Sequence, residues 1–193
     1  METTLSWYKE NAPLYAEETK YSLVYDALGE FLSRVEEKGR ILDLGCGSGR
    51  DSFFFLERGF YVDSLDGSEA MKREAERLFG INVRLSDFLS LDEEEKYDGV
   101  WAQASILHLE EESLRKVLNL ISRALKTGGV FYTSFRKGEV DGFENGRWYT
   151  NMTESRFSSL LPPNLQIEKS WEGKDVRPGV NKTWLSIISR KEG

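Results

Sequence analysis

Cysteine and histidine are nearly missing from this chain, which has one of each among its 193 residues. The single thiol, Cys46, excludes an internal disulfide and a cysteine-based zinc site. Histidine and acidic residues do not cluster at metal-ligand spacing either, so the sequence predicts no metal centre. His108 is the only side chain whose ordinary pKa suits it to act as a base near neutral pH.

Long apolar runs and an excess of positive charge are also missing. No stretch of about 20 apolar residues occurs, and the first residues are neither basic nor apolar, so we expect a cytoplasmic protein without membrane contact. Acidic residues outnumber basic ones by 33 to 26, for a net charge of −7. A protein that follows nucleic-acid phosphates carries the opposite excess, so no nucleic-acid partner is expected.

Three glycines at alternate positions follow the first apolar strand. Residues 40–50 read RILDLGCGSGR, so Asp43 precedes Gly45, Gly47 and Gly49. Glycine lets the backbone turn tightly after a strand and lets a ligand approach main-chain N–H groups. A helix that begins here also points its partial positive charge into the same space. The run is therefore typical of a loop that cradles a nucleotide-like ligand.

This run resembles motif I of the class I S-adenosylmethionine (SAM)-dependent methyltransferases, in which an acid such as Asp43 stands two residues before the first glycine. Dinucleotide-binding loops read Gly-x-Gly-x-x-Gly instead, and the third glycine position here is Arg50. SAM has no pyrophosphate, and Arg50 would suit its carboxylate because a guanidinium pairs with it in a fork. Ser48 is expected to open the next helix, with Asp51 completing a capping box.

Two further strands end in acids that match the same family. Residues 61–68 end a strand at Asp66, about 20 residues past the loop, as expected of the acid that binds ribose hydroxyls. Asp63 is a rival acid, but it lies inside the strand. Asp87 follows a strand-like run at 81–85 and resembles the acid beside the adenine amino group, the alternative being a surface turn.

Two later segments complete the resemblance in the same order. Residues 97–109 read YDGVWAQASILHL and resemble the stretch where the fourth strand ends beside the donor methyl group, with Ser105 at that mouth. Residues 124–132 read ALKTGGVFY, with Thr127 where family members often have proline. The resemblance assigns cofactor binding to Asp43, Gly45, Cys46, Gly47, Ser48, Gly49, Arg50, Asp66, Gly67, Ser68, Met71, Asp87, Phe88, Gln103, Ala104 and Tyr15.

Strand and helix patterns alternate along the chain, which indicates an α/β fold with a parallel sheet and helices on both faces. The resemblance implies a Rossmann-like, doubly wound sheet of seven strands in the order 3-2-1-4-5-7-6, with the last strand antiparallel. A wide apolar stripe predicts a helix over 19–38. The remaining elements are expected as helices at about 49–58, 68–79 and 110–126, a strand at 129–135, a polar loop at 136–147, a helix capped by Thr153 that ends near Leu161, and strands at about 165–172 and 183–190.

The length and the 39% apolar content fit one domain over residues 1–193. Within it we expect a helical lid or packing segment at 1–38, a SAM-binding core at 40–135, and a substrate-side loop with a C-terminal hairpin at 136–193. The sequence leaves a monomer or a homodimer open.

Three segments are candidates for the methyl acceptor: the aromatic N-terminal segment, the end of the fifth strand and the loop after it. Aromatic core packing and a solvated strand end are the alternative interpretations. Small methyltransferases of the tellurite-resistance type, and those of types 11 and 12, are the branch that the chain resembles. The candidates are Trp7, Tyr8, Tyr21, His108, Arg136, Lys137, Arg147, Trp148 and Tyr149.

The expected activity is transfer of a methyl group from SAM to a small-molecule acceptor by in-line displacement, with S-adenosylhomocysteine (SAH) as product. The cofactor carries the hard chemistry, so the protein mainly has to position the acceptor. No catalytic residue is assigned; His108 is a candidate base, with a role in capping a helix or orienting a loop as the alternative. A SAM-binding regulatory protein and a nicotinamide-dependent oxidoreductase are the alternative functions.

Overall fold

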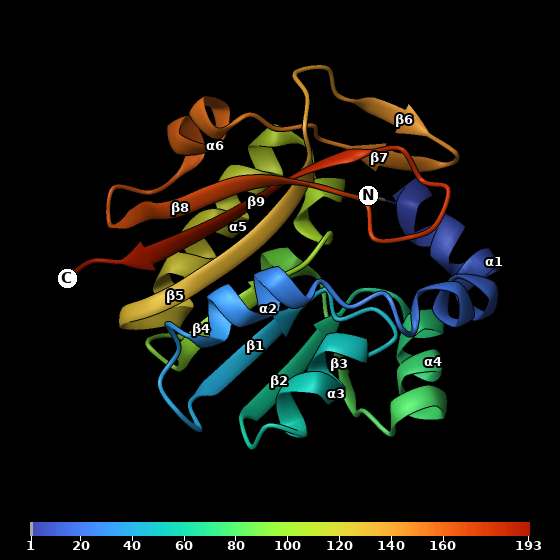
Figure 1. Ribbon diagram of the computed structural model, residues 1–193, viewed down its shortest axis with the longest axis horizontal. Helices are drawn as coiled ribbons and strands as arrows, with labels where there is room; N and C mark the ends of the chain where they lie inside the picture. Colours follow the sequence, from blue (N-terminus) through green and yellow to red (C-terminus); the bar gives the residue numbers. More distant parts are fainter. Residues whose placement is uncertain (1) are drawn as a thin grey trace.

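The computed structural model describes residues 2–193, with side chains from residue 3 onward. A seven-stranded sheet runs through the molecule and has helices on both faces (Figure 1). Its strand order is β3-β2-β1-β4-β5-β9-β8, and β9 is antiparallel to β5. The order expected from the resemblance is confirmed, since β8 and β9 are the sixth and seventh strands of this sheet in the chain.

The elements follow one another as the alternating pattern predicts. The strands of the main sheet are β1 (Arg40–Leu44), β2 (Tyr61–Asp66), β3 (Val83–Leu85), β4 (Tyr97–Ala102), β5 (Leu125–Arg136), β8 (Leu165–Lys174) and β9 (Thr183–Lys191). The helices are α1 (Glu2–Thr19), α2 (Tyr25–Leu32), α3 (Arg50–Leu56), α4 (Glu69–Phe79), α5 (Glu111–Ala124) and α6 (Glu154–Leu160), with short 3-10 helices η1 (Phe88–Ser90) and η2 (Ile106–His108). Strands β6 (Gly142–Glu144) and β7 (Arg147–Tyr149) form a separate hairpin.

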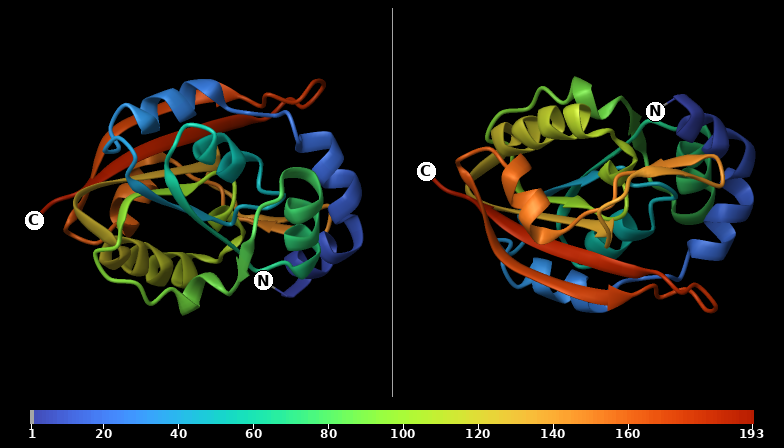
Figure 2. Two further views of the ribbon diagram at one scale, coloured as in Figure 1. Left: turned by 90° about the horizontal axis from the view of Figure 1, so that it is seen from below. Right: turned by 90° about the horizontal axis from the view of Figure 1, so that it is seen from above.

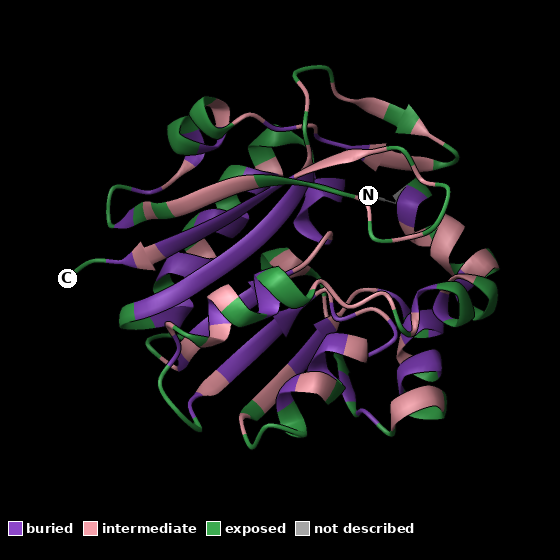
Figure 3. Ribbon diagram, viewed as in Figure 1, coloured by how far each residue is buried: buried purple, intermediate pink, exposed green. Residues whose placement is uncertain are grey.

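Alternate residues of the central strands feed two separate cores. In β1, Ile41 packs with α2 and α3, whereas Leu42 and Leu44 pack with α5 on the other face. Figure 2 shows α2 and α5 on opposite sides of the sheet, and Figure 3 shows its central strands as the most buried part of the fold. On the α2 face, Trp101 stacks on Tyr132 with ring centroids 4.0 Å apart.

Two expectations about local structure were wrong. The helix predicted over 19–38 is only α2, because residues 20–24 run without helix between α1 and α2. Leu23 and Val24 still pack against the core on that side, so their apolar spacing reports burial and not helix. The loop predicted over 136–147 contains β6 and leads into β7, with a turn at Asn145 and Gly146 that both have positive φ.

None of the helices in residues 2–193 has the length and apolar content needed to cross a bilayer.

The packing of α2 on β4 predicts opposite effects for two glycine substitutions. A Cβ on Gly99 would lie 2.6 Å from Cζ of Phe31, whose ring is held by Phe55 and Trp101. We expect Gly99→Ala to lower the free energy of unfolding by about 1–3 kcal/mol through overpacking. Gly29→Ala in α2 meets no atom within 4 Å and should raise it by about 0.5–1 kcal/mol. Urea unfolding of both variants measures this; equal effects would contradict the packing described.

Candidate active site

A cavity of about 500 Å³ opens at the carboxyl ends of β1, β2 and β4. This is the edge at which open α/β sheets bind ligands. The loop between β1 and α3 forms one wall, and α1, β7 and the segment between β8 and β9 form the other. In Figure 1 these segments meet between the sheet and α1.

The first glycine of the loop, Gly45, leaves no room for a side chain. The main-chain N–H groups of Gly45 and Cys46 both donate to the carbonyl oxygen of Leu65, at 2.7 and 3.0 Å. Gly45 has a φ of 77°, and a Cβ there would lie 2.4 Å from Cβ of Ser105. The left-handed backbone and the close approach of η2 both require glycine at this position.

Asp66 closes the loop from the end of β2. Its Oδ2 accepts the N–H of Gly47 at 2.8 Å, and its Oδ1 accepts the N–H of Ser68 at 2.8 Å. Burial raises the pKa of Asp66, while these N–H groups oppose the rise. Each oxygen keeps a further lone pair, and the residue lines the cavity. Asp63 instead points away and pairs with Arg40 at 3.0 Å.

A buried polar network underlies the loop. Oδ2 of Asp43 accepts the hydroxyl of Ser52 at 2.6 Å, and that hydroxyl lies 2.7 Å from Oγ of Ser64. Burial raises the pKa of Asp43, and the negative charge of Asp51 adds to the rise. Asp43 therefore binds its proton more tightly than an exposed aspartate does.

The capping box expected at the start of α3 does not form. Gly49 is the N-cap, and no side chain caps the helix. Asp51 turns inward instead, because Nε1 of Trp101 donates to it at 2.9 Å and Arg50 grips it with Nε and Nη2, at 2.7 and 2.9 Å. Arg50 lines the cavity, but its fork is already occupied by a carboxylate of the chain itself.

Gln103 lies at the end of β4, between the two walls of the cavity. Its Oε1 accepts the hydroxyls of Tyr132 at 2.7 Å and Ser134 at 3.1 Å. Because the oxygen is used twice, the two amide N–H groups remain for the cavity that Gln103 lines.

Aromatic rings of α1 form a cage around an arginine of β7. Trp7, Tyr8 and Tyr15 pack edge to face, with ring centroids 5.2–5.8 Å apart. The guanidinium carbon of Arg147 lies 3.9 Å from the centroid of Trp7 and 5.5 Å from that of Tyr149. Stacking on an aromatic face stabilises a guanidinium.

His108 connects helix α1 with strand β7. Its Nδ1 lies 2.6 Å from the carbonyl oxygen of Trp148, and its Nε2 lies 3.3 Å from the hydroxyl of Tyr8. A carbonyl only accepts, so Nδ1 carries the proton and Nε2 accepts from the tyrosine. Burial lowers the pKa of His108 to about 4, with the charges of Arg147 and Arg136 acting in the same direction.

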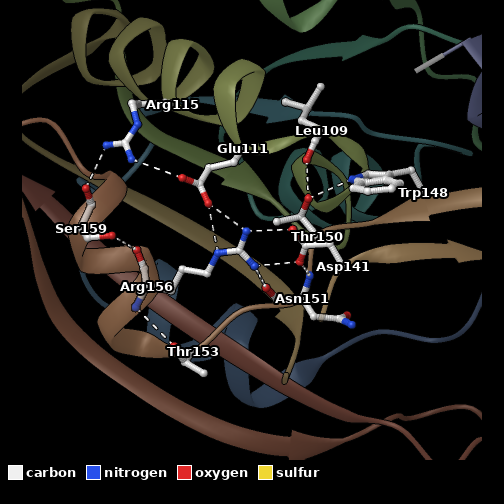
Figure 4. Close-up of polar contacts among 10 residues, drawn as sticks. All are labelled: Leu109, Glu111, Arg115, Asp141, Trp148, Thr150, Asn151, Thr153, Arg156 and Ser159. Atoms are coloured by element: carbon white, nitrogen blue, oxygen red, sulfur yellow. Dashed lines mark hydrogen bonds and ion pairs between the residues drawn. The ribbon is translucent and has the colours of Figure 1, made fainter. Parts of the chain in front are cut away.

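The hairpin that carries Arg147 is anchored at its base by Arg156 of α6 (Figure 4). Arg156 donates to both oxygens of Asp141, at 2.7 and 2.8 Å, and to the carbonyl of Asn151 at 2.8 Å. Beside it, the hydroxyl of Thr150 donates to the carbonyl of Leu109 at 2.6 Å. These contacts fix the strand that faces α1.

Most residues predicted from the sequence line this one cavity. Those that do are Asp43, Gly45, Cys46, Gly47, Ser48, Arg50, Asp66, Gly67, Met71, Asp87, Phe88, Gln103, Ala104, Tyr15, Tyr8, His108, Arg136, Arg147 and Tyr149. Those that do not are Gly49, Ser68, Trp7, Tyr21, Lys137 and Trp148.

The six residues outside the lining have other contacts or are exposed. Ser68 caps α4, and Gly49 packs on Ile81. Tyr21 is 81% exposed and Lys137 pairs with Glu172, so neither faces the cavity. Both tryptophans are used in contacts within the protein. Arg147 stacks on the ring of Trp7, and Nε1 of Trp148 donates to the hydroxyl of Thr150 at 3.0 Å.

The sequence missed the contribution of the last two strands. Trp171, Asp175 and Arg177 line the cavity from the end of β8 and the turn beyond it. Trp184 and Ser186 line it from β9, two positions apart, as residues on one face of a strand must be. That alternation was the only signal, and it identifies a face without saying what the face meets.

Comparisons with known proteins agree on the family. A family model described as a methyltransferase domain matches residues 41–129. A sarcosine/dimethylglycine N-methyltransferase from Aphanothece halophytica is 33% identical over 141 residues, which cover 65% of this chain and 50% of that protein. These comparisons support a class I SAM-dependent methyltransferase.

Other members of the family match over different shares of their length. An uncharacterized methyltransferase from Staphylococcus carnosus is 21% identical over 164 residues, covering 80% of this chain and 79% of that protein. The crystal structure of 1,6-didemethyltoxoflavin-N1-methyltransferase from Burkholderia thailandensis shares the fold, with a TM-score of 0.80 at 22% identity over 100% of this chain and 88% of that one. Several curated relatives are matched over about half their length.

The residues of this methyltransferase fit the cofactor that its family uses. SAM has a ribose with two hydroxyls, and Asp66 offers free lone pairs beside the glycine loop. It has an apolar adenine ring, and the ring of Phe88 lies beside the space above Gly45. SAM also carries a net positive charge, which the acid Asp87 of the same wall complements.

Burial of neutral His108 predicts a specific acid sensitivity. Its pKa is lowered in the folded state, so between pH 6.5 and 4 the unfolded chain binds more protons, and stability is lost as the pH falls through that window. We expect the wild type to lose about 2 kcal/mol more than His108→Gln between pH 7 and pH 5. Urea unfolding at both pH values measures the difference. Equal losses in the two proteins would show that His108 is not held neutral.

Proposed function

We propose that this chain binds SAM against the glycine loop and transfers its methyl group to a small-molecule acceptor on the opposite wall. The observation that carries the proposal is a single cavity with two chemically different walls at the end of β4. One wall is the glycine loop with the acidic side chains beside it. The other is an aromatic chamber with arginines, built from α1, β7 and the β8–β9 segment.

The proposed cofactor contacts follow from the atoms that remain free. Asp66 takes the ribose hydroxyls, and Phe88 packs on the adenine. Asp87 uses Oδ1 to accept the N–H of Leu89 at 2.8 Å, so its second oxygen is left for the adenine amino group. The methionine carboxylate can meet Arg50 only by sharing it with Asp51. The hydrogen bonds to Asp51 hold this guanidinium in place.

When bound, SAM supplies a methyl group on a sulfonium, and the acceptor's lone pair forms the new bond as sulfur takes the electrons of the breaking one. The chain's own residues position the acceptor and exclude water, since α1 seals the chamber. We propose that His108 positions Tyr8 and β7 and is not the base. Both its ring nitrogens are engaged, and its pKa of about 4 makes it a weak base at neutral pH.

The named relatives support a small acceptor. The Aphanothece protein is named for sarcosine and dimethylglycine, and the Burkholderia structure contains 1,6-didemethyltoxoflavin with SAH. The cavity volume of about 500 Å³ lies in the range of ~300–1,000 Å³ typical of small-molecule sites. We propose one domain over residues 1–193, in which α1 is the lid of the chamber.

Calorimetric titration with SAM, SAH and NAD tests the cofactor half of the proposal. We expect SAM and SAH to bind and NAD to fail. Asp66→Asn should weaken SAH binding at least tenfold, because hydrogen bonds to a charged group contribute about 1.5–3 kcal/mol each. Asp63→Asn is the matched control, since Asp63 lies on the same strand and pairs outside the cavity with Arg40 and Lys96.

Two outcomes would contradict the proposal. Tight NAD binding, or an equal loss in both aspartate variants, would mean that the loop does not hold SAM. SAH binding without SAH production, over a panel of small amines, thiols and carboxylates, would favour a SAM-binding regulatory protein.

A further inference from the structure

The two walls of the cavity carry opposite charge. The acidic side chains of Asp66 and Asp87 lie on the glycine-loop wall, where burial raises the pKa of Asp43 to about 8 and Arg50 is paired with Asp51. Arginines lie on the other wall, at the end of β5, on β7 and beyond β8. This separation stands out in a chain whose net charge is −7, because random placement of its charges would leave the chamber acidic.

Arg147 is the cation of that wall without a counter-ion. Among the side chains that the structure describes, no acidic group forms an ion pair with it, whereas Arg136 pairs with Glu144 at 2.9 Å and Arg177 with Asp175 at 2.6 Å. Its Nε is buried and has no hydrogen-bond partner. A charge removed from water without a partner destabilises the fold, so such a group marks a place that a ligand completes.

Arg136 leaves a second donor beside it. Its Nε is also buried without a hydrogen-bond partner, although Nη1 is held by Glu144. Both guanidinium groups lie on the ring of Tyr149, at 3.4 Å for Arg136 and 5.5 Å for Arg147. The guanidinium groups of two arginines therefore flank one aromatic ring that lines the cavity.

The ion pairs of this wall leave one of its arginines without a partner. Arg136 shares Glu144 with Lys182, at 2.9 and 3.0 Å, and Arg177 pairs with Asp175. The other charged residues of this part of the lining, Lys174 and Asp26, are exposed and opposite in sign. Arg147 is half-buried, and no acid among the described side chains forms an ion pair with it.

We infer that the methyl acceptor carries a carboxylate, which binds the guanidinium of Arg147 beside that of Arg136, while its apolar body lies among the rings of α1. A carboxylate matches this site because it is planar, carries one charge and takes hydrogen bonds from guanidinium groups in a fork. The inference rests on the proposed function, because it names the class of acceptor for the same cavity.

The test uses the full chain saturated with SAH and two probes of equal shape, benzoate and benzamide, with inorganic phosphate as a third. Calorimetry should show benzoate binding at least tenfold tighter than benzamide or phosphate. Arg147→Gln should remove this preference, and Arg147→Lys, which keeps the charge but not the fork, should retain part of it. Arg73→Gln is the matched control, because Arg73 is an exposed arginine of α4 outside the cavity.

The possible results distinguish a failure of the carboxylate proposal from a failure of the proposed function. SAH binding with no preference for benzoate, or with a preference that survives in Arg147→Gln, overturns the carboxylate and leaves the cofactor half standing. Phosphate binding as tight as benzoate overturns the choice of a singly charged carboxylate. Failure of SAH itself to bind the wild type overturns the proposed function. Unchanged SAH affinity in Arg147→Gln shows that the variant is folded.

Discussion

The carbonyl oxygen of Leu65 accepts two successive main-chain N–H groups of the glycine loop, and the cavity depends on that contact. It holds the loop against the end of β2, so that Asp66 can reach Gly47 across the same gap. A carbonyl at the end of a parallel strand has no partner in the sheet, and the loop satisfies it. The sheet edge is thereby turned into one wall of a binding site at no cost in unpaired polar groups.

The opposite wall of the cavity is not built from one short segment of the chain. Its rings come from α1, its arginines from β5, β7 and the segment after β8, and its anchors from α6. Each part is positioned by contacts with a distant part of the chain. The glycine-loop wall can therefore keep its form while the other wall changes, which agrees with similar proteins that are named for different acceptors.

This contrast explains what the sequence predicts and what it does not. The strand order was predicted from the resemblance to a known family, whereas the glycine loop and the choice of Asp66 over Asp63 follow from residues of neighbouring strands and loops. The expected capping role of Asp51 was wrong because Asp51 instead accepts a hydrogen bond from Trp101, which lies 50 positions later in the chain. Tyr21 is a candidate only because its side chain is aromatic, and the type of side chain does not predict the direction in which it points. In the structure Tyr21 is exposed.

The contact of α1 with β7 has a consequence for the order in which the molecule is completed. The main-chain N–H of Trp148 donates to the hydroxyl of Thr4, 144 positions earlier in the chain. During synthesis the first helix therefore leaves the ribosome long before its docking surface exists. A nascent chain that has reached the end of β5 already has its glycine loop and the strands around it, but the wall formed by α1, β7 and the β8–β9 segment is completed only in the last quarter of translation.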